Sequence, residues 1–215
     1  MRALVSGAER LRAGRAPRRR RSEARRAGSA YTRRAMEHDG GWRRRSSRYL
    51  FESPWFRLRQ DEITLPNGDE ITYTLVDHGG YVVVVPVLED GRVVMERVFR
   101  HTVSRTLLEC PAGGLDGEDP ATAARRELEE ETGYRASGIT HLGRFVGSAG
   151  ISNERFDVCL ATGLRAGGVI RRENTEQMEV ELLDLLDLRS RALRGEIEDA
   201  PSALAILLAA ARLDP

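Results

Sequence analysis

Hydrophobic residues in the middle of the chain form short runs separated by turn residues. Two runs, 61–65 and 71–76, flank the dipeptide Asn67-Gly68, which is a strong signal for a β-hairpin. The run 81–87 is almost continuously apolar, as is typical of a strand buried on both faces, and 92–98 predicts its neighbour in a core sheet. Further elements are expected as strands at 106–110, 139–146, 156–161 and 178–183, and as an Ala/Leu-rich helix at 203–213.

A short helix is predicted at residues 120–132. Asp119 is suited to cap its N-terminus, and Pro120 is favoured in the first helical turn. Gly133 then ends the helix, because glycine readily adopts the left-handed conformation at that position. The helix is therefore bounded at both ends by residues of the expected type.

Three glutamates share one face of this predicted helix. Glu127 lies three residues before Glu130 and four before Glu131, so like charges repel and weaken an isolated helix by a few tenths of a kcal/mol per pair. A bound cation offsets this repulsion, and Mg²⁺ prefers such oxygen ligands. The alternative is a solvated acidic helix that uses Arg125 and Arg126 as salt-bridge partners.

The acidic segment resembles the sequence box of the Nudix hydrolases. The matching residues are Glu118, Arg126-Glu127-Leu128, Glu130-Glu131 and Gly133-Tyr134. The departure is Ala112, which stands where the family has a glycine, while Gly113 and Gly114 follow it. The resemblance implies an α+β fold, the Nudix α/β/α sandwich with a mixed sheet between helices, extended by an N-terminal antiparallel β-hairpin. It also implies Mg²⁺, with Mn²⁺ as a possible substitute, held by Glu118, Glu127, Glu130, Glu131 and the backbone carbonyl of Ala112.

Residues before the box resemble those of ADP-ribose and other nucleoside-diphosphate-sugar pyrophosphatases. The resemblance implies that Arg100 and Arg105 bind phosphate or ribose oxygens and that Glu109 accepts from a ribose hydroxyl. Arginine suits the first role because its planar fork of donors matches such oxygens; a surface role is the alternative. Trp55 or Phe56 would stack on the base, or else lie in the core or in the interface of a homodimer.

The implied reaction is Mg²⁺-dependent hydrolysis of a pyrophosphate bond in ADP-ribose or another nucleotide sugar. Glu131 would help to hold the metal that activates water, and Arg126 would orient a carboxylate. Glu176 is expected as the general base, with Glu154 and Glu173 as substitutes. The alternative is that Glu176 is an exposed acidic residue of the loop without a catalytic role. Ala149 replaces the proline usual in ADP-ribose enzymes, so another nucleotide sugar is an alternative substrate. A separate alternative is a non-catalytic Nudix-fold module that senses nucleotides or binds RNA.

The chain is expected to contain three parts: an Arg-rich extension at 1–47, a hairpin and dimerisation region at 48–80, and the Nudix domain at 81–215. Residues 1–35 hold twelve arginines and two glutamates within a chain of net charge +1. This composition predicts disorder. A transit peptide and nucleic-acid binding are alternatives, as is a true start at Met36, in which case no nucleic-acid partner is expected.

Composition also favours a cytoplasmic location. No apolar run approaches the roughly 20 residues that a membrane span requires, so no membrane association is expected. Cys110 and Cys159 lie in apolar segments without the spacing of metal ligands. They are predicted to be buried free thiols, which suits a reducing compartment. A cytoplasmic enzyme with a small-molecule nucleotide substrate is therefore expected.

Overall fold

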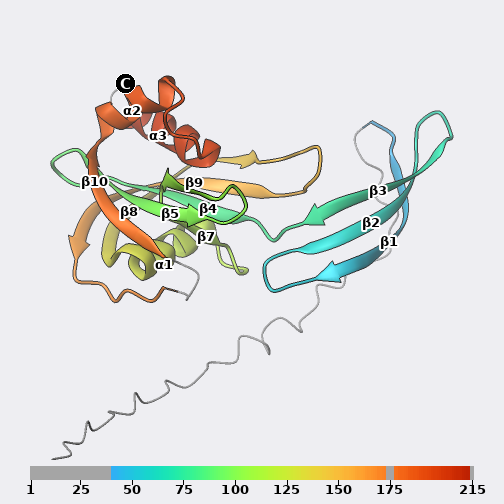
Figure 1. Ribbon diagram of the computed structural model, residues 1–215, viewed down its shortest axis with the longest axis horizontal. Coiled ribbons are helices and arrows are strands. Elements are labelled where there is room, and N and C mark those ends of the chain that lie inside the picture. Colours follow the sequence, from blue (N-terminus) through green and yellow to red (C-terminus); the bar gives the residue numbers. More distant parts are fainter. Residues whose placement is uncertain (1–39, 173–176, 214–215) are drawn as a thin grey trace, which may run out of the picture. The chain divides into compact units, whose positions relative to one another are not determined.

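The N-terminal part of the described chain is a separate antiparallel sheet. The computed structural model describes residues 40–172 and 177–213 (Figure 1). The sheet has the strand order β1-β2-β3. Its β2–β3 turn contains Asn67-Gly68, and Gly68 has a φ of 90°, which only glycine adopts without strain. This confirms the expected hairpin. The strands are β1 (Arg43–Glu52), β2 (Arg57–Thr64) and β3 (Glu70–Asp77).

Strand β1 was not expected from the sequence. The boundary expected between residues 47 and 48 falls inside this strand and is corrected to a position before Arg43. The physical reason is that β1 pairs through its backbone with β2, from Arg43 opposite Thr64 to Glu52 opposite Arg57. Its side chains are almost all exposed, so they carry no alternation of apolar and polar residues. The expectations for residues 1–35 and Met36 lie outside the described residues.

Two further sheets form the body of the structure. The strand order is β10-β5-β6 in one and β7-β4-β9-β8 in the other, where β4 and β9 are parallel and the other pairs are antiparallel. The strands expected at these places are all present, and β7 is an additional short one. Their bounds are β4 (Tyr81–Pro86), β5 (Arg92–Arg100), β6 (Arg105–Glu109), β7 (Ala112–Gly114), β8 (Tyr134–Val146), β9 (Arg155–Ala166) and β10 (Met178–Asp184).

Strand β4 is buried on both faces, as its apolar run predicts. Val82 and Val84 pack against α1 (Pro120–Thr132), in a cluster that includes Leu128. Val83 and Val85 face the opposite side and join the larger core. Because side chains alternate along a strand, one uninterrupted apolar run supplies two cores.

Helices cover both sides of the four-stranded sheet, and Figure 1 shows α1 on the side opposite to α2 and α3. Helix α3 (Ala200–Leu213) is the predicted Ala/Leu-rich helix, whereas α2 (Leu185–Leu193), capped by Asp184, was not predicted. This arrangement confirms the α+β class with a mixed sheet between helices. Among residues 40–172 and 177–213, no helix has the length and apolar character to span a membrane.

Candidate active site

The acidic helix α1 has the expected boundaries. The carboxylate of Asp119 accepts from the backbone amides of Ala121 and Thr122, both at 3.1 Å. At the other end Gly133 has a φ of 74° and its amide donates to the carbonyl of Glu129. Two free amides at the N-terminus are therefore satisfied locally, and the left-handed Gly133 ends the helix. Between these ends, Glu127 and Glu131 lie against residues of β7.

Arg126 is the centre of a cluster of carboxylates, which we call the Arg126 cluster: Arg126, Glu118, Glu127 and Glu130. Its guanidinium donates to Glu118 Oε2 at 2.9 Å and to Glu127 Oε1 at 2.5 Å, and lies 3.5 Å from Glu130 Oε2. It also donates to the carbonyl of Gly114 at 2.8 Å. Burial alone would lower the pKa of Arg126, but the hydrogen bond to Glu118 and the charge of Glu127 raise it overall. The arginine stays charged and ties the helix to the preceding loop.

Glu127 and Glu131 are buried, with 9% and 5% of their surface exposed. Glu131 accepts a hydrogen bond from the amide of Ala112 at 3.0 Å. A Cβ atom at Gly113 would lie 2.1 Å from the carboxylate of Glu127. The close approach that requires glycine therefore falls at Gly113, so alanine is tolerated at residue 112.

The donor set suits a hard divalent cation. The expected ligands, four glutamates and a backbone carbonyl, all provide oxygen atoms. In the part of the chain that the structure describes, however, no three His, Cys, Asp or Glu side chains converge as a metal site. Arg126 instead supplies one positive charge among three carboxylates. The chemistry of the residues fits a metal, because every expected ligand is an oxygen atom.

Two of the expected substrate residues bind each other. Arg100 on β5 donates to both oxygens of Glu109 on β6, at 2.9 and 3.2 Å from Nε. Glu109 is 5% exposed, and the hydrogen bond to it is the main cause of the raised pKa of Arg100. Arg105 pairs with the exposed Glu198 at 2.6 Å. Arg100 and Glu109 are thus a preformed pair, whereas Arg105 forms an exposed ion pair.

Tyr81 was not singled out from the sequence, yet it lies within the electrostatic reach of several expected site residues. Burial raises the pKa of its hydroxyl, and the charges of Glu154, Asp199 and Glu109 raise it further. Its ring stacks on Phe156 with centroids 5.5 Å apart. The sequence gives no signal for this role, because Tyr81 begins an apolar strand. The charges of Glu109, before β7, and Glu154, in the β8–β9 loop, thus both act on this one hydroxyl.

The expected aromatic residues lie in the β1–β2 turn. Ser53 Oγ accepts from the amides of Trp55 and Phe56 and donates to the carbonyl of Phe56. Trp55 is 66% exposed, and the ring of Phe56 contacts Phe51 at 5.9 Å. These contacts belong to the N-terminal sheet and do not bring either residue to α1.

A segment before the expected general base covers the end of α1. The amide of Arg171 donates to the carbonyl of Glu130 at 2.8 Å, and Arg172 Nε donates to the carbonyl of Glu131 at 2.8 Å. Arg172 also donates to the carbonyl of Met178 at 3.2 Å. This contact was not predicted. Glu173 and Glu176 themselves lie outside the described residues, so their expected roles stay predictions.

Family models match most of the described chain. The model described as the NUDIX domain matches residues 77–204, and the nucleoside diphosphate sugar hydrolase N-terminal domain matches residues 42–76. The junction between the two matches lies at the end of β3. The three-stranded N-terminal sheet and the two-sheet body therefore correspond to two matched regions.

Similar proteins of known name agree with these matches. The chain is 39% identical over 163 residues to the ADP-ribose pyrophosphatase of Bacillus subtilis (strain 168), covering 73% of this chain and 86% of that protein. It is 37% identical over 165 residues to the ADP-ribose pyrophosphatase of Mycobacterium tuberculosis (strain ATCC 25618 / H37Rv), covering 75% and 80%. A solved structure of an ADP compounds hydrolase shares the fold, with a TM-score of 0.70, 21% identity, and 79% and 92% of the two chains covered.

Proposed function

Because the chain belongs to the Nudix hydrolase family, we propose that it hydrolyses the pyrophosphate bond of ADP-ribose, yielding AMP and ribose 5-phosphate, in a reaction that requires Mg²⁺. The observation that carries this proposal is the Arg126 cluster beside the buried Glu127 and Glu131. A purely structural salt-bridge network does not need three carboxylates around one guanidinium. Another nucleoside-diphosphate sugar is the alternative substrate, because Ala149 replaces the proline usual in ADP-ribose enzymes.

The metal would be held by Glu127, Glu130 and Glu131, with Glu118 and the carbonyl of Ala112 completing the set. A bound Mg²⁺, or Mn²⁺ in its place, neutralises phosphate charge and lowers the pKa of a coordinated water. Arg126 orients Glu118 and Glu127 through its planar fork of donors. Ala112 fixes Glu131 through its amide.

Proton transfer requires an acid outside the helix. Glu176 remains our proposed general base, with Glu173 as a substitute. Of the acids proposed for this step, Glu154 is the one within the described residues, and its charge acts on Tyr81. A base within reach of the attacking water removes its proton as the bond to phosphorus forms.

Substrate contacts are proposed for the paired residues near Tyr81. Arg100 has a half-exposed side chain, so it can donate to phosphate oxygens while Glu109 holds its orientation. Glu109 has further acceptor capacity for a ribose hydroxyl. Arg105 would release Glu198 and bind the substrate in its place. Stacking of Trp55 or Phe56 on the base requires that the N-terminal sheet of a second protomer reaches the site.

We also propose that residues 48–80 mediate a homodimer. Large apolar side chains exposed on the N-terminal sheet support this, among them Phe51 at 54% and Trp55 at 66%. Sedimentation of the full chain and of Trp55→Ala tests the interface. The free, buried Cys110 and Cys159 support a cytoplasmic location, and no nucleic-acid partner is proposed for residues 40–215.

The proposed activity is tested by incubating the protein with Mg²⁺ and a panel of ADP-ribose, other nucleotide sugars, NADH and diadenosine polyphosphates. Products are separated by chromatography. We expect AMP and ribose 5-phosphate from ADP-ribose, and neither product when EDTA replaces Mg²⁺. Preferential cleavage of another sugar nucleotide would change the substrate assignment. Tight binding without turnover would favour the alternative of a nucleotide-sensing module.

A further inference from the structure

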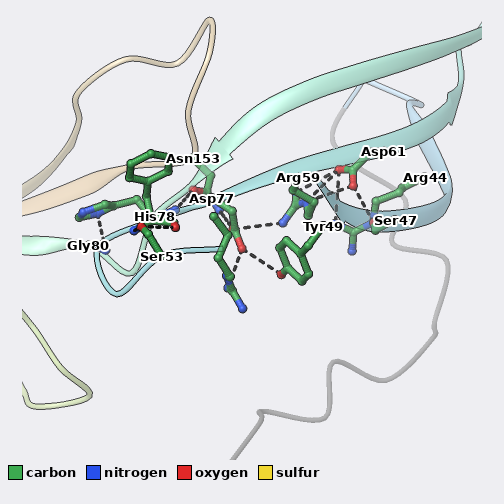
Figure 2. Close-up of polar contacts among 12 residues, drawn as sticks. Arg44, Ser47, Tyr49, Ser53, Arg59, Asp61, Asp77, His78, Gly80 and Asn153 are labelled. Atoms are coloured by element: carbon green, nitrogen blue, oxygen red, sulfur yellow. Dashed lines mark hydrogen bonds and ion pairs between the residues drawn. The ribbon is translucent and has the colours of Figure 1, made fainter. Parts of the chain in front are cut away.

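A buried carboxylate lies at the junction between the N-terminal sheet and the body of the protein. Asp77, at the end of β3, is 7% exposed. It accepts from Tyr49 at 3.0 Å, from Arg57 at 2.6 Å and from Arg59 at 3.2 Å. The fourth donor is Asn153 Nδ2 at 2.5 Å, which comes from the β8–β9 loop (Figure 2). We call these five residues the Asp77 cluster.

Asn153 binds this junction in both directions. While its amide nitrogen donates to Asp77, its side-chain oxygen accepts from the backbone amide of His78 at 2.9 Å. The backbone repeats the connection, because the amide of Asn153 donates to the carbonyl of Val76 at 3.3 Å and the amide of Val76 donates to the carbonyl of Ile151 at 2.8 Å. The loop is thereby added to the end of β3 as a short parallel segment.

The residue after Asn153 is Glu154, whose position depends on the same loop. Its amide donates to Ser152 Oγ at 2.8 Å, and its carbonyl accepts from Gly147 at 3.4 Å. The side chain lies over Gly147, where a Cβ atom would come within 2.8 Å of Glu154 Oε2. The charge of Glu154 then acts on Tyr81. A shift of the loop would move this carboxylate relative to Tyr81.

We propose that Asn153, held by Asp77, is a positioning residue that sets the location of Glu154 for the hydrolytic reaction. The inference rests on the proposed function, in which Glu154 is a candidate for proton transfer. The neutral amide of Asn153 serves both bonds, since it presents an acceptor to His78 and a donor to Asp77. An aspartate at the same position would face the carboxylate of Asp77 with a like charge, and an alanine would make neither bond.

A purely structural role predicts a different pattern from a positioning role. If the cluster only stabilises the fold, then loss of any donor to Asp77 lowers stability and leaves turnover unchanged. If Asn153 positions Glu154, its loss lowers kcat, whereas loss of Tyr49 does not. Tyr49→Phe is therefore the matched control, because it removes one hydrogen bond to Asp77 and leaves every contact of the loop in place.

The test combines kinetics with hydrogen exchange on the full chain. We expect Asn153→Ala to lower kcat about tenfold with KM changed by less than about twofold, and to speed amide exchange at 147–154 about tenfold. Tyr49→Phe should show neither effect. The exchanged pair Asp77→Asn with Asn153→Asp restores a donor and an acceptor across the same two positions, and should recover part of the lost kcat.

Two results would overturn the inference. One is a wild-type kcat in Asn153→Ala. The other is an unchanged rate of amide hydrogen exchange at residues 147–154 in that variant. If Asn153→Ala does not fold, Asn153→Gln retains the amide but displaces it by one methylene, and an unchanged kcat in that variant contradicts the inference equally. A wild-type protein that hydrolyses no compound of the panel overturns the proposed function instead, which distinguishes the two failures.

Discussion

The Arg126 cluster and the Asp77 cluster both combine guanidinium and carboxylate groups, but in opposite proportions. Around Arg126, one guanidinium faces the carboxylates of Glu118, Glu127 and Glu130. Around Asp77, one carboxylate faces the guanidinium groups of Arg57 and Arg59. The second cluster is balanced further by Asp61, which pairs with Arg59 at 3.0 Å.

This difference indicates where the protein requires a further positive charge. Buried ionic groups are tolerated when their charges are paired and their hydrogen bonds are satisfied. The Asp77 cluster meets this condition together with Asp61. The Arg126 cluster sets one guanidinium against three carboxylates, and Glu131 adds a fourth carboxylate from the same helix face. A divalent cation would balance the Arg126 cluster. This need for a cation distinguishes the proposed catalytic site from the structural junction at Asp77.

The largest effect is expected from removing one charge at the acidic helix. Glu131→Gln retains the shape of the side chain and its acceptor for Ala112, but weakens one of the ligands that we propose for the metal. We expect kcat to fall about 10³-fold, because metal stabilisation of charge in the transition state is worth several kcal/mol. Steady-state kinetics with ADP-ribose and Mg²⁺ measures it.

The control for this variant is Glu129→Gln. Glu129 lies on the same helix but pairs with Arg135 at 2.7 Å, and that hydrogen bond is the main cause of its pKa of about 2. We expect its kcat to remain within about twofold of wild type, because its contacts lie outside the Arg126 cluster. Equal losses of kcat in Glu131→Gln and Glu129→Gln would contradict the placement of the metal on the helix face that carries Glu131.

The second-largest effect is expected from changing the shape of the positively charged group at residue 126. Arg126→Lys retains the charge but loses the planar fork that reaches Glu118, Glu127 and Gly114 together. We expect kcat/KM to fall about 10²-fold, because misplaced ligands reduce catalysis steeply. The matched variant Arg125→Lys, one residue earlier on the exposed side, should retain wild-type kinetics. If Arg126→Lys does so too, charge alone is sufficient there.

The Asp77 cluster should respond in stability and in its dependence on pH. Asp77→Asn leaves Arg57 without its charged acceptor and Arg59 with Asp61 alone, so we expect the free energy of unfolding to fall by about 2 kcal/mol at neutral pH. Burial alone would raise the pKa of Asp77, but the hydrogen bonds from Asn153 and Tyr49 and the charges of both arginines lower it below its usual 3.8.

The sign of the pH effect follows from that direction. A depressed pKa in the folded state contributes stability that is present above the unfolded value, and this stability is lost as pH falls through the folded value. Urea unfolding of wild type and Asp77→Asn should therefore differ by a constant amount from neutral pH to about pH 5. The difference should narrow below pH 3.8. A difference that grows on acidification would contradict this assignment.

The smallest effect is expected at the C-terminal end of α1. Arg172→Ala removes the donors to the carbonyls of Glu131 and Met178. Cations that cap helix C-termini contribute about 1 kcal/mol, and we expect a loss of that size in thermal or urea unfolding. Arg135→Ala, which removes an exposed pair with Glu129, should cost less than half as much. Equal losses would mean that Arg172 acts only as a surface charge.

The sequence predicts the acidic helix well because its information is local. Asp119 and Gly133 mark the ends, and the spacing of Glu127 and Glu131 fixes a shared face. The same holds for the hairpin at Asn67-Gly68 and for the doubly buried strand β4. Each of these features depends on residues within a few positions of one another, so propensity and periodicity are sufficient.

Features that depend on distant pairing could not be predicted in this way. Asp77 and Asn153 are 76 positions apart, and neither belongs to a periodic pattern. Strand β1 pairs through its backbone while its side chains remain exposed, so it leaves no apolar alternation. Helix α2 was missed for a local reason: it directly follows β10, and the leucines on both sides of its N-cap Asp184 continue the apolar character of the strand into the helix.

The central claim is that the negative charge gathered around α1 serves a divalent cation. The most direct measurement is Mn²⁺ binding to the full chain by electron paramagnetic resonance, with Mg²⁺ as competitor, in wild type, Glu127→Gln and Glu129→Gln. The account predicts that Glu127→Gln weakens Mn²⁺ binding at least tenfold, by about 1.4 kcal/mol, while Glu129→Gln binds as wild type does. Equal affinity in all three proteins would contradict it.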